Sequence, residues 1–206
     1  MATPSLVREL NRQRAELMIT ALEAVALRLF DQRGFEVTVD EIATEAQISA
    51  RTFYRYFPAK EDVFQVRIDR RSERLSVVLA ARPLDEPPLH SLRVALEEVV
   101  SEEDPELVRL WTGVIAATPA VIKGVLGGIQ LKGHRVTAEF LATRLGVAAD
   151  ALVPVMLAAA VGGVIQAAQT QWFFQGGELA GRIAEGLAVL VRGIGPDPGP
   201  WSTSTA

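Results

Sequence analysis

Apolar residues in the first part of the chain recur at the spacing of an amphipathic helix. One stripe follows the positions i, i+3, i+4, i+7 and i+8, and it consists of Leu22, Val25, Ala26, Leu29 and Phe30. This spacing places the five side chains on one helix face. Gly34 is a typical helix stop. We therefore expect a helix from Arg12 to Arg33, preceded by a flexible arm over residues 1–11.

The next segment predicts two short helices that are joined by a tight turn. Thr38 and Glu41 have the spacing of a capping box, so a helix is expected to start there. Ser49 can cap a further helix over residues 50–56. Two short helices behind a longer one form a helix-turn-helix, whose second short helix enters the major groove of DNA. The pattern predicts such a domain over residues 12–60.

Helical signals continue towards residue 193, and no segment predicts a β-strand. Pro58 suits the first turn of a linking helix over residues 58–81. Prolines at positions 83, 87 and 88 mark a boundary, so residues 82–194 are expected to form a second domain. Its helices are expected at 89–101, 105–117, 118–145 (with a bend at residues 127–128), 151–174 with Asp150 as its cap, and 179–193. A tail over 195–206 is expected to be flexible. The predicted fold class is all-α.

Composition narrows the class of protein further. Apolar residues make up 49% of the chain, which favours a packed core over disorder. The absence of cysteine excludes disulfides, zinc–thiolate sites and cysteine nucleophiles, and it fits a cytoplasmic location. No charged residue lies between Asp150 and Glu178, but glutamines in this stretch argue against a membrane span. We expect a helix that is buried on most sides in a soluble protein.

A local excess of positive charge marks the second short helix, although the net charge of the chain is −4. The stretch from the turn to position 60 has no acidic residue, and its charged side chains are Arg51, Arg55 and Lys60. On a helix, Arg51, Tyr54 and Arg55 can share a face, while Phe53 and Phe57 point to the core. Guanidinium, ammonium, hydroxyl and phenol groups all bind phosphates. This pattern indicates contact with DNA.

These residues carry a resemblance to a known family. Residues 14–64 resemble the DNA-binding domain of the TetR family of transcriptional regulators. The matching pieces are Ala21 to Phe30 with Gly34-Phe35, Thr38 to Ala43, and Ile48 to Asp62. The last piece is close to a family signature of Thr, an aromatic residue, Tyr, Phe and Lys.

The resemblance implies a role for each polar residue of the motif. Thr38 would hold a phosphate, while Arg51 and Thr52 would approach base edges. Where many members have histidine after the tyrosine, this chain has Arg55 and Tyr56, so Arg55 adds either a contact or charge alone. Tyr54, Tyr56 and Lys60 would bind phosphates. The expected DNA-binding set is Thr38, Ser49, Arg51, Thr52, Tyr54, Arg55, Tyr56 and Lys60.

The last two predicted helices are candidates for dimerisation. The 151–174 helix is apolar nearly all round and rich in small residues, and the 179–193 helix has one apolar side. Two helices from each subunit could form a four-helix interface, as the family resemblance also implies. The alternative is that both helices fill the core of one chain.

A ligand pocket is expected in the second domain, because pockets combine apolar walls with a few polar groups. Its candidate lining residues are Trp111, Ile115, Phe140, Met156, Gln166, Gln169, Trp172 and Phe173. In the layout from Asp104-Pro105-Glu106 to Pro119-Ala120 and in the helix from Asp150 to Gln175, this domain also resembles, more loosely, a TetR subgroup with acyl-coenzyme-A-like ligands. Its negative charge argues against a strongly anionic ligand unless basic residues gather at the pocket, namely Lys123, Lys132, His134 or Arg135. An uncharged apolar ligand is an equal alternative.

The main alternative class is an enzyme, and the sequence gives little support for a catalytic site. His90 and His134 lie at neither metal-ligand nor triad spacing, so we expect no catalytic residue, metal or cofactor. A helical interaction or scaffold protein would leave the basic motif unexplained. We expect a homodimeric repressor, away from membranes, that a small apolar or acyl-type ligand releases from a palindromic double-stranded DNA operator.

Overall fold

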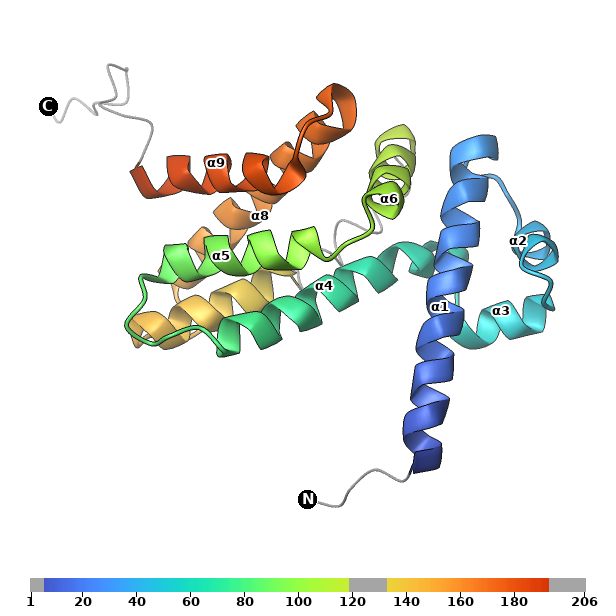
Figure 1. Ribbon diagram of the computed structural model, residues 1–206, viewed down its shortest axis with the longest axis horizontal. Helices are drawn as coiled ribbons and strands as arrows, with labels where there is room; N and C mark the ends of the chain where they lie inside the picture. Colours follow the sequence, from blue (N-terminus) through green and yellow to red (C-terminus); the bar gives the residue numbers. More distant parts are fainter. Residues whose placement is uncertain (1–5, 119–132, 193–206) are drawn as a thin grey trace, which may run out of the picture.

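The computed structural model describes residues 6–118 and 133–192, and Figure 1 shows their arrangement. α1 (Leu6–Arg33) carries α2 (Val39–Glu45) and α3 (Ala50–Tyr56) on one side. These three helices form what we call the head. The described ranges contain helices and no strand, which confirms the predicted all-α class.

The other helices form the body. α4 (Val63–Ala80) runs from the head into the body, and a 3₁₀ turn over Lys60–Asp62 precedes it where an α-helix from Pro58 was expected. The remaining body helices are α5 (Pro88–Ser101), α6 (Pro105–Ala117), a helical segment over 133–145, α8 (Leu152–Gln175) and α9 (Leu179–Arg192). α9 packs on α5 and α8, and α6 turns back onto α1. The expected bend at residues 127–128 and the tail over 195–206 lie outside the described ranges.

Local hydrogen bonds set the geometry of α2 and α3. Thr38 Oγ1 accepts from the Glu41 backbone N–H at 3.3 Å, and Glu41 Oε2 accepts from the Thr38 N–H at 2.8 Å. Ser49 Oγ accepts from the Thr52 N–H at 3.1 Å and caps α3. Between the two helices, Gln47 has a φ of +54°, a left-handed conformation that tightens the turn. The predicted caps at Thr38 and Ser49 and the predicted helix-turn-helix are confirmed.

Besides that of α4, two further helix starts differ from the prediction. α1 begins at Leu6, so the second half of the expected flexible arm is helical. An ion pair one turn apart, Arg12 to Glu9 at 2.9 Å, supports this first part of the helix. α8 is capped by Ala151 without a side-chain hydrogen bond, so the predicted cap by Asp150 is wrong.

The core of the head extends across the expected domain boundary near residue 82. Phe30 and Phe64 are buried there with Phe53, and Trp111 of α6 belongs to the same cluster. The Trp111 indole N–H also donates to the Phe64 carbonyl at 3.2 Å. A second core lies among α4, α5, α8 and α9. The boundary therefore separates stretches of sequence but not the cores, because α6 packs back onto α1.

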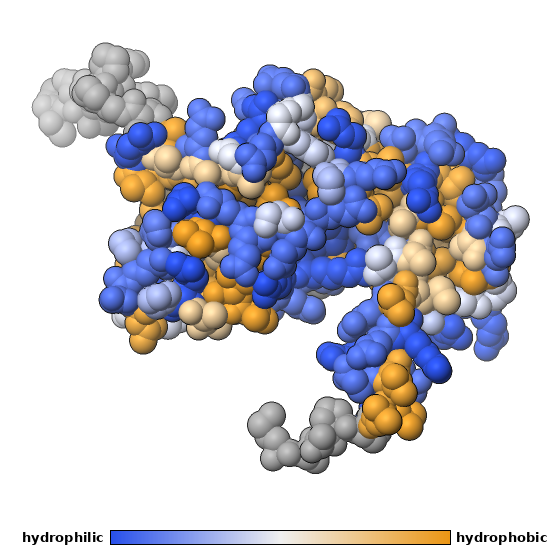
Figure 2. Space-filling model, in the orientation of Figure 1, coloured by the Kyte–Doolittle hydropathy of each residue, from blue (hydrophilic) through white to orange (hydrophobic). Residues whose placement is uncertain are grey.

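α8 is covered less than its sequence predicted. By length and composition it could cross a membrane, yet 28% of its most apolar 18-residue stretch is buried. Leu152 is 78% exposed and Phe174 is 71% exposed. The expectation of a helix buried on most sides is wrong for the single chain. A second exposed apolar group, Leu6, Val7 and Leu10, lies at the free end of α1 (Figure 2).

We predict opposite effects for one substitution at two positions of α9. A Cβ added at Gly186 would lie 2.5 Å from Val164 Cγ1 of α8, whereas at Gly181 the nearest contact is 3.4 Å, to Glu178. Overpacking costs about 1–3 kcal/mol, while alanine in place of helical glycine gains about 1 kcal/mol. Gly186→Ala should thus lower the urea midpoint of unfolding and Gly181→Ala should raise it. Equal gains at both sites would show that α8 and α9 are not packed this closely.

Candidate functional site

The outer face of α3 presents the side chains that the sequence singled out. Arg51, Tyr54 and Arg55 are exposed, and Tyr54 is 51% accessible. On the inner face, Phe53 and Phe57 are buried with ring centroids 5.2 Å apart, and they anchor α3 in the head core. The helix has no acidic residue. α3 thus offers a basic, hydrogen-bonding surface on a rigid base.

Three hydroxyls of the predicted DNA-binding set are engaged within the head. Thr38 Oγ1 donates to Glu41 Oε2 at 2.9 Å, so its proton is already used. Ser49 Oγ and Thr52 Oγ1 lie 2.9 Å apart and share one proton between them. A hydroxyl has one donor and two acceptor sites, so this pair keeps one proton for an outside acceptor. Ser49 and Thr52 are therefore better placed than Thr38 to donate to DNA.

Lys60 has a structural role that the sequence did not reveal. Its Nζ donates to the carbonyl oxygens of Phe35 at 2.6 Å and Val37 at 3.0 Å, which belong to the loop between α1 and α2. The ammonium also lies 4.1 Å from the centroid of the Phe35 ring. Two of its three N–H groups are thus occupied by the head itself. In this arrangement the side chain fastens the loop, and one donor is left for a phosphate.

Arg55 and Tyr56 form a pair at the end of α3. Arg55 Nη2 donates to the Tyr56 hydroxyl at 3.1 Å, and its guanidinium carbon lies 4.9 Å from the centroid of the Tyr56 ring. Tyr56 is half-buried and packs against the head core. The contact holds the guanidinium at the surface of the helix. Arg55 therefore contributes an ordered positive charge at this edge of α3.

A cavity of about 600 Å³ lies in the body between α4, α5, α6, the 133–145 segment and α8. Four of the eight predicted ligand-binding residues line it, namely Trp111, Ile115, Gln166 and Gln169. Of the four basic residues considered for the pocket mouth, His134 lines the cavity, and burial lowers the pKa of its imidazole. Arg135 pairs with Glu139 at 3.6 Å instead. Lys123 and Lys132 lie outside the described ranges.

The other four predicted residues lie outside this cavity. Met156 is 52% exposed on α8. The Trp172 indole N–H donates to the Gly177 carbonyl at 3.1 Å, and its ring stacks with Arg109. Phe173 packs against Gly113 of α6, and Phe140 packs with Arg144. Their amino-acid types are typical of a pocket lining, but the rotation of each helix about its axis points these side chains away from the cavity.

The sequence missed two arginines of α4 that line the cavity. Arg71 binds Glu103 through Nε at 3.0 Å and Nη2 at 2.6 Å, and Arg67 Nη2 lies 2.6 Å from the same carboxylate. Burial raises the pKa of Glu103, but Arg71 and Arg67 outweigh it and the net shift is downward. Burial, together with the charge of Arg71, lowers the pKa of Arg67 to about 10. The cavity wall therefore carries the buried Arg67 and the partly buried Arg71, whose guanidinium groups share one carboxylate.

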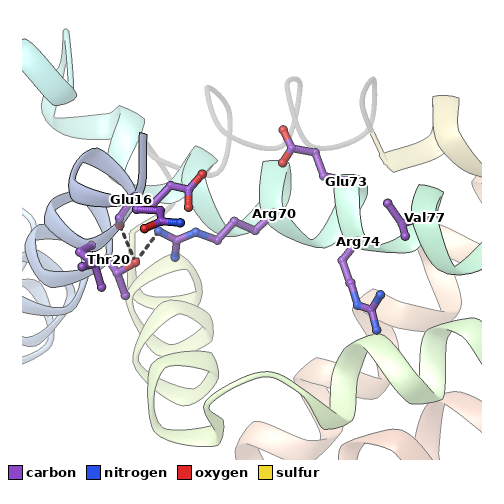
Figure 3. Close-up of a pocket in the computed structure, with 8 residues that line it drawn as sticks. Glu16, Thr20, Arg70, Glu73, Arg74 and Val77 are labelled. Carbon is purple, nitrogen blue, oxygen red and sulfur yellow. Dashed lines mark hydrogen bonds between the residues drawn. The ribbon is translucent and has the colours of Figure 1, made fainter. Parts of the chain in front are cut away.

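A groove lies between α1 and α4, where the head meets the body (Figure 3). In it Arg70 donates through Nη2 to Thr20 Oγ1 at 2.8 Å and through Nη1 to Glu23 Oε2 at 2.8 Å. Glu23 is 2% exposed, and burial raises the pKa of its carboxyl against the opposing effect of Arg70. Arg74, one turn further along α4, binds Glu98 and Glu102 of the body. α4 is thus fixed by arginines to both parts.

Comparisons with known proteins agree with this architecture. The sequence pattern described as "Bacterial regulatory proteins, tetR family" matches residues 22–66, and the pattern of the "MftR C-terminal domain" matches residues 86–195. A helix-turn-helix head in front of this helical body defines a class of DNA-binding transcriptional regulators. The second match covers more than half of the chain. The chain belongs to the TetR family.

Two curated relatives are similar over part of their length. The HTH-type transcriptional regulator TcmR of Streptomyces glaucescens is 36% identical over 102 residues, which are 48% of this chain and 43% of TcmR. EthR of Mycolicibacterium smegmatis is 32% identical over 127 residues, 50% of this chain and 58% of EthR. The matches thus span about half the length of each relative.

Solved structures share the fold across nearly the whole chain. FadR of Thermus thermophilus, a TetR-family repressor in complex with lauroyl-CoA, covers 88% of this chain and 97% of its own, with a TM-score of 0.57 and 23% identity. FadR of Bacillus halodurans covers 85% and 98%, with a TM-score of 0.64 and 16% identity. At these identities the likeness establishes the fold.

We predict that Lys60→Met destabilises the head. The change leaves the carbonyl oxygens of Phe35 and Val37 without their charged donor, and a hydrogen bond to a charged group contributes about 1.5–3 kcal/mol. The free energy of unfolding in urea should fall by about that amount. As a control, Arg51→Met removes an exposed cation from α3 and should leave stability within about 0.5 kcal/mol of the parent. Equal stabilities of the two variants would contradict the structural role of Lys60.

Proposed function

We propose that this regulator is a sequence-specific repressor that works as a homodimer in the cytoplasm and leaves its DNA operator when a small apolar or acyl-type ligand binds. The observation that carries the proposal is the exposed, acid-free face of α3, with Arg51, Tyr54 and Arg55 outward and two phenylalanines anchored beneath it. Arginine donors of this kind read guanine edges, and phenol groups hold phosphates. In this proposal Arg51 and Thr52 approach bases.

The uncovered apolar faces of α8 and α9 support dimerisation. Leu152 and Phe174 of α8 and Val191 of α9 are each more than 60% exposed, and large apolar residues that a single chain leaves uncovered favour a protein interface. Two copies joined there would present two α3 helices, and paired helix-turn-helix units read half-sites about one DNA turn apart. The operator is therefore proposed to be palindromic.

The shared residues of head and body support ligand-induced release. Trp111 lines the cavity and also packs in the head core, and α4 forms both the cavity wall and the link to α1. A ligand shifts an equilibrium only through its different affinities for the two states. A ligand that prefers one position of Trp111 and α4 would change the spacing of the two heads. FadR of Thermus thermophilus, whose crystal structure is a complex with lauroyl-CoA, is a precedent for acyl ligands in this fold.

Sequence selection from a random DNA library, at stated salt, tests the repressor function. The purified chain should enrich a palindrome whose half-sites lie about one helical turn apart. Addition of an acyl-type or uncharged apolar compound that binds the cavity should then weaken binding to that palindrome. Salt-sensitive binding without enrichment would contradict base reading by α3 and leave phosphate contact only.

We predict that Arg51→Ala weakens the selected operator by about tenfold and relaxes its sequence at one position of each half-site, because a bidentate arginine–guanine contact contributes about 1–3 kcal/mol. Arg135→Ala, which removes an exposed arginine of the body, is the matched control and should bind as the parent does. Fluorescence anisotropy with the operator and with a point-mutated operator measures both effects. Unchanged affinity and selectivity of Arg51→Ala would remove Arg51 from the set of base readers.

A further inference from the structure

The polar end of the cavity carries more positive than negative charge. The charged residues that line it are Arg67 and Arg71, and the carboxylate they share is Glu103. The next acid, Glu23, binds Arg70 at 2.8 Å on the α1 side of α4, and its charge also acts on Arg67. Among the described residues, the three arginines Arg67, Arg70 and Arg71 and the two acids Glu23 and Glu103 therefore leave one positive charge in excess.

Two donors at this end also lack a partner. Arg67 is 8% exposed, and its Nε is buried without a hydrogen bond. Thr112 is 9% exposed, and its Oγ1 is likewise buried and unpaired. A buried polar group without a partner costs free energy, so these atoms favour an acceptor that enters the cavity. With its oxygen facing Arg71, the Gln169 amide accepts from Nη1 at 3.1 Å and Nη2 at 3.2 Å, which orients that guanidinium.

The rest of the lining is apolar and fits a hydrocarbon or aromatic body. Ile68, Leu75, Leu96, Val161 and Ile165 contribute to the walls. A ligand that satisfies both ends has an apolar body and one acidic group. A carboxylate carries a single charge and accepts hydrogen bonds from two sides, whereas a phosphate monoester carries about −1.5 to −2 charges and exceeds the surplus.

We propose that the cavity binds an apolar monocarboxylic acid, whose carboxylate lies between Arg71, Arg67 and Thr112 and competes with Glu103 for the two guanidinium groups. This inference rests on the proposed ligand-binding role of the cavity and specifies its ligand class. It differs from an uncharged ligand and from an acyl thioester, since neither brings an anionic group to the arginines. Binding of the carboxylate would loosen the contact of α4 with the loop before α6.

Calorimetric titration of the full chain with decanoate and with decan-1-ol separates these classes, because the probes differ in their charge and share their chain. Decanoate should bind at least about tenfold more tightly, as expected for charge-assisted hydrogen bonds. Arg71→Met leaves Arg67 and Glu103 as a balanced pair, so it should abolish this preference while decan-1-ol binding persists. Arg74→Met is the control, since Arg74 binds Glu98 and Glu102 outside the cavity.

Two further variants guard against a merely structural effect. Glu103→Gln removes the competing anion, so decanoate should bind more tightly, the opposite of what a damaged site would give. Thr112→Val replaces an unpaired hydroxyl with a methyl group of the same shape, so it should fold as the parent and weaken decanoate several-fold.

Each of the other possible outcomes would refute a defined part of the proposal. Equal binding of the two probes, insensitive to Arg71→Met, would refute the acidic ligand but keep the cavity as a ligand site. Tighter binding of decanoyl-CoA than decanoate, again insensitive to Arg71→Met, would favour a thioester. Failure of both simple probes to bind would refute the ligand site as well, while operator binding, measured separately, would still stand.

Discussion

The carboxylate of Glu103 fixes the linking helix α4 to the rest of the body, and the position of the head depends on that helix. It lies at the end of α5, in the short connection to α6, and it holds two arginines from successive turns of α4. Removal of a partner from a buried ion pair leaves an uncompensated charge, which costs about 3–5 kcal/mol. α4 can therefore move relative to α5 and α6 only if another group takes over these guanidinium contacts. This requirement places control of the linking helix inside the body.

The apolar contacts of Trp111 lead to the same conclusion. Its indole completes the core of the head and at the same time lines the cavity, and its N–H reaches the backbone at Phe64 near the start of α4. A packed core is not continuously deformable, so a shift of this ring is transmitted to its neighbours rather than absorbed. The ion pairs between α4 and Glu103 and the packing of Trp111 on α6 thus both connect the cavity to the position of α4.

The sequence predicted the parts of the fold that local signals determine. The capping box at Thr38, the cap at Ser49 and the aromatic anchors of α3 each depend on residues fewer than ten positions apart, and all are present. The structural role of Lys60 was not predicted, because its acceptors lie 23 and 25 positions away along the chain. Half of the predicted cavity residues missed the cavity, since amino-acid type does not determine the rotation of a packed helix. Arg67 and Arg71 were not predicted to line the cavity, because the acid that binds them, Glu103, lies 36 and 32 positions away along the chain.

Within the head, the residues that maintain the fold differ from those that face outward on α3. This separation affects how the sequence of such a protein can diversify. The residues that fix its shape, including Lys60, Thr38 and the buried phenylalanines, do not overlap with the outward side chains of α3. Exposed positions away from special contacts tolerate substitution within about 0.5 kcal/mol. Arg51, Tyr54 and Arg55 can thus drift to new side chains while the frame beneath them keeps its form. Paralogues of such a regulator could acquire different target genes through a handful of surface changes, without first having to evolve a more stable protein.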